Sequence, residues 1–181
     1  MSGDPIIIVD HDPAWRDAFR RLGTALRDAV GDTARRIDHI GSTSIPGLGA
    51  KPIVDIQISV PALEPMSYRE PIESLGFIWR EHSPELTKRY LRETPGARRT
   101  HIHVRKHGSW HEQYALLFRD YVREHGDAAA RYETVKRELA ARYRNERTRY
   151  TDAKAEVFRE IMTLADRWAA AIGWEPGPTD A

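Results

Sequence analysis

The chain has 181 residues, of which 40% are hydrophobic and 30% charged, so it is long enough to form one compact domain with its own core. Its net charge of +1 provides no overall field that would attract nucleic acid or a membrane surface. It has no cysteine, which excludes disulfides and thiolate metal sites. The apolar run near the start is too short for a signal peptide or a membrane span, and we expect a soluble cytoplasmic protein.

The first hundred residues combine helical and strand patterns. Apolar residues at helical spacing between Asp12 and Gly31 predict a first helix, with Asp12 as its N-cap. Gly76 ends a second, shorter helical pattern. Apolar and β-branched runs predict the strands, which we expect at 34–40, 51–60, 77–80, 88–92 and 100–104.

After Gly108 the pattern becomes helical. Three amphipathic stretches follow, with Asp127 and Thr151 as the expected starts of the second and third. No Gly/Ser/Pro-rich linker separates the two halves, so we expect one domain and a flexible end. The expected boundaries are a domain at 1–175, with an α/β half at 1–108 and a helical half at 109–173, and a flexible tail at 174–181.

The most informative stretch is 39–60, HIGSTSIPGLGAKPIVDIQISV. A small polar turn, Gly41-Ser42-Thr43-Ser44, follows a short apolar segment, and Asp55 lies in the strand beyond it. Such a turn can offer backbone N–H groups and hydroxyls to a phosphate, and a strand carboxylate can hold a divalent cation. Nucleotidyltransferases of the polymerase-β type hold a nucleoside triphosphate in this way. They use two strand carboxylates, however, and here Gln57 stands where the second is expected.

Each of these polar groups also has a structural interpretation. A carboxylate in a strand built to be buried must be paired, hydrogen-bonded or bound to metal, so Asp55 could instead form a salt bridge to Lys51 or an arginine. Ser42 and Ser44 could satisfy only the backbone of their own turn.

His101 and His103 alternate in a predicted strand and therefore lie on one face of it. Two imidazoles at this spacing can share a transition metal, or one can act as a general base. If they face Asp55, the ligand set is mixed nitrogen and oxygen, which suits Mn²⁺, Zn²⁺ or Fe²⁺ better than Mg²⁺. The alternative is a pair of structural histidines.

Basic and aromatic residues elsewhere are candidates to bind an anionic ligand. Lys51 and Arg89 could neutralise a phosphate. Tyr132 and Lys136 are four residues apart and share a helix face. Arg119 and Lys154 also come from the helical half. The alternative for this last group is a polar network that docks the helices on the sheet.

Taken together, these residues resemble the GrpB family, whose fold is related to nucleotidyltransferases. The resemblance covers nearly the whole chain and rests on motifs in one order: Asp10-His11-Asp12-Pro13-Ala14-Trp15, His39 to Leu48, Lys51 to Ile56, His101 to Val104, Phe118 to Tyr121, Tyr132 with Lys136, and Tyr150 with Lys154. It implies an α/β (α+β) fold with a nucleotidyltransferase-like mixed β-sheet flanked by helices and a helical C-terminal half. The family also occurs fused to dephospho-CoA kinase, but this chain has no P-loop motif, so we expect a stand-alone member.

We therefore expect a cleft centred on Ser42, Asp55 and His103 that binds an anionic phosphorylated small molecule or a nucleotide. Asp55, His103 and Lys51 are the candidate catalytic residues, with Mg²⁺, Mn²⁺ or Zn²⁺ as a candidate cofactor. Transfer through two metal ions is disfavoured by Gln57, which brings no charge. The alternatives are a nucleotide- or CoA-binding module without turnover and a single-metal Asp/His enzyme of another class. We expect neither a membrane nor nucleic acid as a partner, and the sequence does not indicate the oligomeric state.

Overall fold

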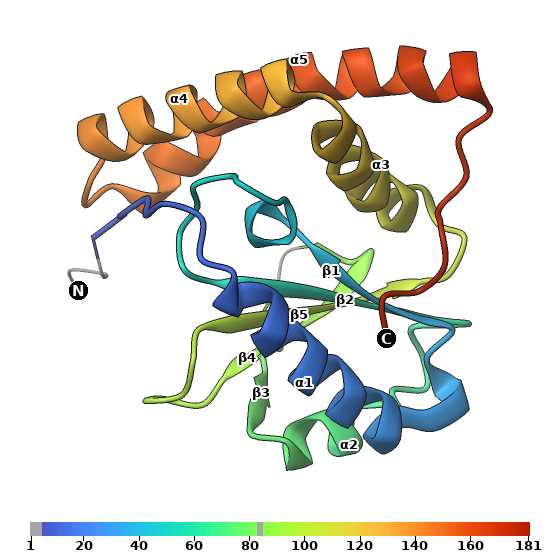
Figure 1. Ribbon diagram of the computed structural model, residues 1–181. Helices are drawn as coiled ribbons and strands as arrows, with labels where there is room; N and C mark the ends of the chain where they lie inside the picture. Colours follow the sequence, from blue (N-terminus) through green and yellow to red (C-terminus); the bar gives the residue numbers. More distant parts are fainter. Residues whose placement is uncertain (1–4, 83–84) are drawn as a thin grey trace.

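The computed structural model describes residues 5–82 and 85–181 and places one mixed β-sheet between two layers of helices (Figure 1). The sheet has five strands in the order β1-β2-β5-β4-β3. β2 and β5 are parallel, and the other neighbouring pairs are antiparallel. The strands are β1 (Arg36–Ile40), β2 (Val54–Val60), β3 (Phe77–Trp79), β4 (Lys88–Glu93) and β5 (Thr100–Lys106).

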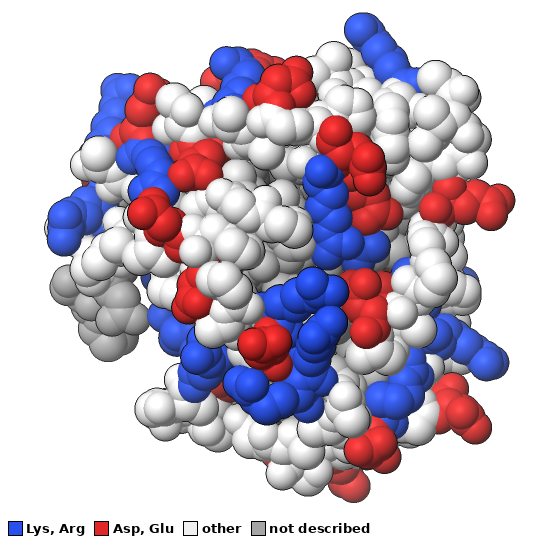
Figure 2. Space-filling view, in the orientation of Figure 1, with Lys and Arg blue, Asp and Glu red and all other residues white. Residues whose placement is uncertain are grey.

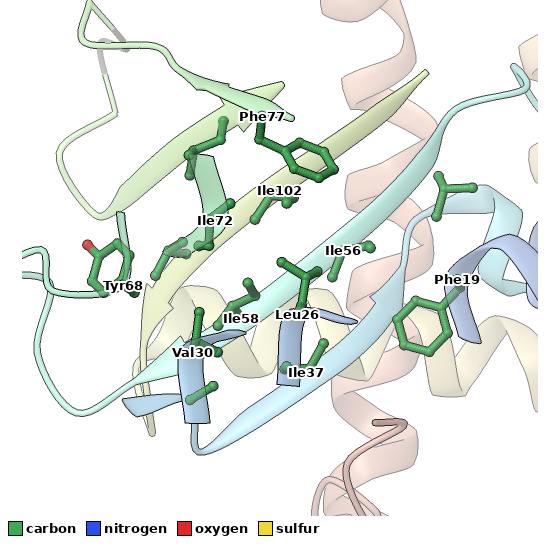
Figure 3. Packing of buried hydrophobic residues seen from close by; sticks show 14 of the residues in the cluster. Phe19, Leu26, Val30, Ile37, Ile56, Ile58, Tyr68, Ile72, Phe77 and Ile102 are labelled. Carbon is green, nitrogen blue, oxygen red and sulfur yellow. The ribbon is translucent and has the colours of Figure 1, made fainter. Parts of the chain in front are cut away.

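One face of the sheet is apolar and covered by α1 (Ala14–Val30) and α2 (Arg69–Ser74). Alternate residues of the strands point to this face, as the period of two requires. Ile56 and Ile58 of β2 and Ile102 of β5 pack there with Leu26 of α1 and Ile72 of α2 (Figure 3). These side chains are excluded from water, and their burial is the main source of stability in this half.

The other face of the sheet carries the intervening, mostly polar residues and lies beneath the helical half (Figure 1). This half consists of α3 (Trp110–Glu124), α4 (Gly126–Arg142) and α5 (Arg147–Ile172). A second core holds the helices together and includes Ile45 and Leu48 from the loop after β1. That loop therefore belongs structurally to both halves of the molecule.

The two ends of the described chain connect the layers. The backbone N–H of Ile6 donates to Arg144 O, and Val9 forms a β-bridge with Ala50. At the other end, the residues after α5 return to the sheet and run beside β1 (Figure 1). Thr179 and Asp180 accept hydrogen bonds from the backbone N–H groups of Ile37 and His39.

The predicted fold class is confirmed, since a mixed sheet is flanked by helices and followed by a helical half. Two predicted helix starts in the helical half differ from the structure. Asp127 lies within α4, which begins at Gly126, and Thr151 lies within α5, where its hydroxyl donates to Arg147 O one turn earlier. No helix among the residues described is long and apolar enough to span a bilayer.

The last eight residues, expected as a flexible tail at 174–181, form hydrogen bonds with β1 in the structure. Their sequence has little local propensity for regular structure, because it contains two prolines and a glycine. The hydrogen bonds of Thr179 and Asp180 are made with β1, more than a hundred residues earlier, so local patterns did not reveal them. Residues 1–4 of the expected domain lie outside the described residues.

Candidate metal centre and its surroundings

Asp55, His101 and His103 meet on the polar face of the sheet. In the parallel pair, Asp55 of β2 is opposite His101 of β5, and Gln57 is opposite His103. Because these four positions share one face, both imidazoles can turn toward the same carboxylate. His101 Nδ1 lies 3.1 Å from Asp55 Oδ1, and His103 Nε2 lies 3.3 Å from the same oxygen. The alternative of a salt bridge from Asp55 to Lys51 is not formed.

The protonation states of these groups follow from their contacts. An ionised carboxylate only accepts hydrogen bonds, so both imidazoles donate to it. Burial acts to raise the pKa of Asp55, but the hydrogen bonds from His101 and His103 outweigh burial and hold it below its ordinary value. Burial lowers the pKa of His103, against the opposing effect of Asp55. The centre therefore contains an ionised carboxylate and a neutral imidazole. For metal binding, the proton on each donating nitrogen would move to the other ring nitrogen of its imidazole.

The spacing of the three side chains fits a metal ion. Each offers one ligand atom, and these atoms lie within 4.8 Å of one another. Neighbouring ligand atoms are about 3.3 Å apart in a tetrahedral zinc site and about 3.0 Å apart in an octahedral shell with bonds of about 2.1 Å. The two separations from Asp55 Oδ1, 3.1 and 3.3 Å, fall in this range. The donor set of two nitrogens and one oxygen suits Zn²⁺, Mn²⁺ or Fe²⁺.

The centre is accessible from one side. The side chain of Asp55 is 28% exposed, and each of the two histidine side chains is 17% exposed. Tyr90 of β4 is opposite His103, and its ring contacts both imidazoles. His101 Nε2 is buried without a hydrogen-bond partner among the described residues. Tyr90 was not predicted as a site residue, because the register of the β4–β5 pair is not readable from the sequence.

Gly41 brings the polar turn directly against the carboxylate. Its φ is +72°, a conformation that glycine adopts without strain. A Cβ atom at this position would lie 2.7 Å from Asp55 Oδ2, so no larger residue fits without moving Asp55. Gly41 is thus required both by the turn and by the close approach of the backbone to the candidate metal centre.

The three hydroxyls of the turn differ in whether they donate a hydrogen bond within the loop. Ser44 Oγ donates to Gly41 O, and Thr43 Oγ1 donates to Ile53 O, so both hydroxyl protons are used within the loop. Ser42 is partly exposed, and its hydroxyl bonds with no residue in the part of the chain that the structure describes. Among the three predicted hydroxyl ligands, Ser42 alone keeps its donor available.

Two lysines lie within electrostatic reach of Asp55. Lys51 sits over the ring of Tyr150, 5.3 Å from its centroid. Burial and the neighbouring Lys154 lower the pKa of Lys51 to about 8, against the effect of Asp55. The pKa of Lys154 is raised, first by Tyr132 against the effect of burial, and then by Tyr150 and Asp55. Neither lysine forms a salt bridge with an acid in residues 5–82 or 85–181.

Lys136 has a structural role. Its ammonium group is buried, donates to Gly49 O at 2.6 Å and lies 4.6 Å from the centroid of the Tyr132 ring. Glu133 accepts from the N–H of the same glycine. Burial and the proximity of Lys154 lower the pKa of Lys136 to about 7. Tyr132 and Lys136 therefore connect α4 to the loop after β1.

Two of the predicted anion ligands lie away from the centre. Arg89 shares the sheet face of Val104, opposite to that of His103, and pairs with Glu64 at 2.8 Å. Arg119 is buried and pairs with Asp120 at 2.7 Å and with Asp180 at 2.9 Å, so its charge is already compensated. Arg119 anchors α3 and the returning end of the chain to the sheet.

Gln57 brings no charge in place of the second carboxylate, and its Oε1 is buried without a hydrogen-bond partner among the described residues. It is fully buried, and its amide donates to Glu112 O at the start of α3. Its side chain therefore docks the helical half on the sheet, and Asp55 is the one carboxylate that β2 offers to a cation.

The comparisons with known proteins agree with this architecture. The model of the family described as GrpB protein matches residues 5–164. The chain belongs to the GrpB family. A crystal structure of the conserved protein GrpB from Enterococcus faecalis is 30% identical and matches with a TM-score of 0.78, covering 87% of this chain and 98% of that one.

Curated relatives include longer proteins. A dephospho-CoA kinase of Mycolicibacterium paratuberculosis is 33% identical over 199 residues, covering 95% of this chain and 49% of the relative. A UPF0157 protein of Pseudomonas aeruginosa is 38% identical over 122 residues, covering 65% of this chain and 50% of the relative. The matched region thus spans about half the length of each of these two relatives.

A more distant structure shows the fold. The Cid1 poly(U) polymerase is 11% identical and matches with a TM-score of 0.51, covering 75% of this chain and 44% of that one. The predicted nucleotidyltransferase-like fold is therefore confirmed for this GrpB protein, and the candidate centre lies on the sheet of that fold.

Proposed function

We propose that this GrpB protein binds a phosphorylated small molecule of the nucleotide class through a single divalent metal ion. The metal is held by Asp55, His101 and His103. The observation that carries the proposal is the convergence of these three side chains on Asp55 Oδ1, with separations of 3.1 and 3.3 Å, on an accessible part of the sheet. A metal ion bound there would act as a Lewis acid and polarise a phosphate oxygen of the ligand.

The surrounding charges support an anionic ligand. The metal ion would neutralise Asp55 and leave Lys51 and Lys154 as positive charges without a paired acid among the described residues. Two ammonium groups beside a cation are costly unless an anion joins them. Ser42 adds a hydroxyl on the same loop as Gly41, which touches Asp55.

The names of relatives and of a structural neighbour support the nucleotide class. Several curated relatives are named dephospho-CoA kinase, and one structural neighbour is named a poly(U) polymerase bound to MgATP.

The ligand set favours a single metal ion. Asp55 is the one carboxylate that β2 offers, whereas a pair of metal ions needs bridging carboxylates. A nitrogen-rich set also favours a transition metal over Mg²⁺.

The metal content of the purified protein tests the centre. We expect one transition-metal ion per chain in the wild type, loss in Asp55→Ala and His103→Ala, and retention in His82→Ala. His82 is an exposed histidine outside the cluster and serves as the control. Absence of metal from the wild type, or its retention in both cluster variants, would contradict the proposal.

The affinity of the metal-loaded protein for adenosine triphosphate tests the ligand. We expect the affinity to fall roughly tenfold or more in Lys51→Gln and in Lys154→Gln, because each removes a charge-assisted contact. Lys106→Gln, at the exposed end of β5, should leave it unchanged. Equal binding by all four proteins would show that the lysines do not face the ligand.

A further inference from the structure

A basic pocket lies on the side of the polar turn that faces α1, opposite to the candidate metal centre. It has a volume of about 540 Å³ and is bordered by α1, the end of β1, the turn and α3. None of Asp55, His101 and His103 lines it. His39 does, and it faces away from Asp55 because it is opposite Ile56 in the β1–β2 pair and stacks on Phe19 of α1. The pocket is therefore separate from the candidate metal centre.

Three guanidinium groups, those of Arg16, Arg20 and Arg123, line this arginine pocket. Arg16 and Arg20 are one helical turn apart on α1 and are exposed, and neither pairs with an acid in the described residues. Like charges at this spacing destabilise a helix. Arg123 approaches from α3, and burial together with the charges of Arg119 and Arg16 lowers its pKa. The repulsion among these groups would be relieved by a bound anion.

The positive charge of this pocket is only partly neutralised by the chain itself. Asp180 is the one acid that lines it, and its carboxylate is held by Arg119 and by the N–H of His39. Arg123 donates to Ser44 O and has Asp120 at 3.8 Å. Figure 2 shows Lys and Arg side chains gathered over α1 on this face. An excess of about two positive charges remains, which matches a phosphate dianion.

The remaining walls suit the organic part of a small molecule. Phe19 and His39 are stacked with centroids 4.8 Å apart, and Pro13 and Pro46 also line the space. His39 is neutral at neutral pH, because burial lowers its pKa to about 3. His11 also lines the pocket, and its Nδ1 is buried without a hydrogen-bond partner among the described residues. A volume of about 540 Å³ is that of a small-molecule site, whereas nucleic acid needs an extended basic track.

We propose that the pocket formed by Arg16, Arg20 and Arg123 binds the phosphate group of a small phosphomonoester. The site is independent of the metal centre. The guanidinium groups of Arg16 and Arg20 would contact the phosphate, because neither pairs with an acid among the described residues. Arg123 of α3 adds a third guanidinium group to the pocket. The polar turn would then have an anion site on each side.

Calorimetric titration with inorganic phosphate tests this proposal, at low ionic strength and with a chelator so that the metal centre is not loaded. We expect binding to the wild type that weakens roughly tenfold or more in each of Arg16→Gln and Arg20→Gln. Arg21→Gln is the control, because Arg21 is an exposed arginine of the same helix that lines a different part of the surface.

The lysine variants separate this proposal from that of the metal centre. Lys51→Gln combined with Lys154→Gln should keep phosphate binding if the arginine pocket is the site. Loss in that double variant with retention in Arg16→Gln and Arg20→Gln would overturn the proposal. So would an equal loss in Arg21→Gln, which would indicate general charge attraction, or no binding to the wild type at millimolar phosphate. The metal-content test with Asp55→Ala is independent of this titration, so either proposal can fail without the other.

Discussion

The two faces of the sheet use the same strands for different purposes. Toward α1 and α2, β2 and β5 present Ile56, Ile58 and Ile102, which are removed from water and hold the layers together. Toward the helical half, the intervening positions present Asp55, His101 and His103, which remain partly accessible. The comparison shows that one strand can contribute to both the core and the candidate site. Every second side chain packs in the core, and the intervening side chains face the helical half, where they can bind a ligand.

The largest expected effect comes from the apolar face. Ile102→Ala should lower the free energy of unfolding by about 4 kcal/mol, because the cavity it leaves is fully enclosed. Ile78→Ala, on the polar face and 37% exposed, should cost less than about 1 kcal/mol. Urea unfolding of both variants measures the difference. Similar costs at the two positions would show that the faces are not distinct energetically.

The next effect concerns His39 and pH. Burial, with Arg123 and Arg119 acting in the same direction and Asp55 opposing, lowers its pKa from 6.5 to about 3. The unfolded chain therefore binds a proton that the folded chain does not, and stability is lost as pH falls below about 6.5. Between pH 7 and pH 5 we expect a loss of about 2 kcal/mol from this group.

Urea titrations at the two pH values, on the wild type and on His39→Gln, test this expectation. The variant has no imidazole to protonate, so its loss should be smaller by the contribution of His39. An identical pH dependence in both proteins would show that His39 is not the group responsible.

The polar face can be tested at its closest contact. Gly41→Ala and Gly47→Ala both place a side chain at positive φ, and backbone strain alone should cost each variant about 1–3 kcal/mol of stability. Only at Gly41 does the new Cβ approach Asp55 Oδ2, at 2.7 Å, whereas nothing lies within 4 Å of a Cβ at Gly47. We therefore expect Gly41→Ala alone to lose bound metal. Equal metal content in the two variants would argue against a centre at Asp55.

The smallest expected effect is on stability at the centre itself. With metal removed by a chelator, Asp55→Asn should lower the free energy of unfolding by about 1 kcal/mol, because the ionised form that the histidines favour is lost, while partial exposure and the retained oxygen acceptor limit the cost. Thermal unfolding of the metal-free proteins is the measurement. A cost above about 2 kcal/mol would mean that Asp55 and its histidines serve the fold.

The sequence predicted the strands of the sheet and placed His101 and His103 on one strand face, because side chains alternate along a strand. Their meeting with Asp55 was a hypothesis, since the pairing of β2 with β5 joins residues distant in sequence. Arg89 was predicted to bind the anionic ligand, but it lies on the opposite face of the sheet from the candidate metal centre. Leu91 is the buried apolar residue of β4, and Arg89 lies two positions before it, so strand alternation places Arg89 on the same, apolar face of the sheet. Tyr90 and Arg123 could not be predicted, because strand register and helix docking depend on contacts distant in sequence.

The segment that follows α5 has a consequence for self-association. β1 is an edge strand, and the outward N–H groups of Ile37 and His39 would otherwise be free to pair with a strand of another molecule. Thr179 and Asp180 occupy those donors, and Ile37 O accepts from Ala181 N–H. At the opposite edge, β3 has only three residues and offers little to pair with. The sheet is thus protected at both sides against edge-to-edge aggregation, by a covering segment at one edge and by brevity at the other.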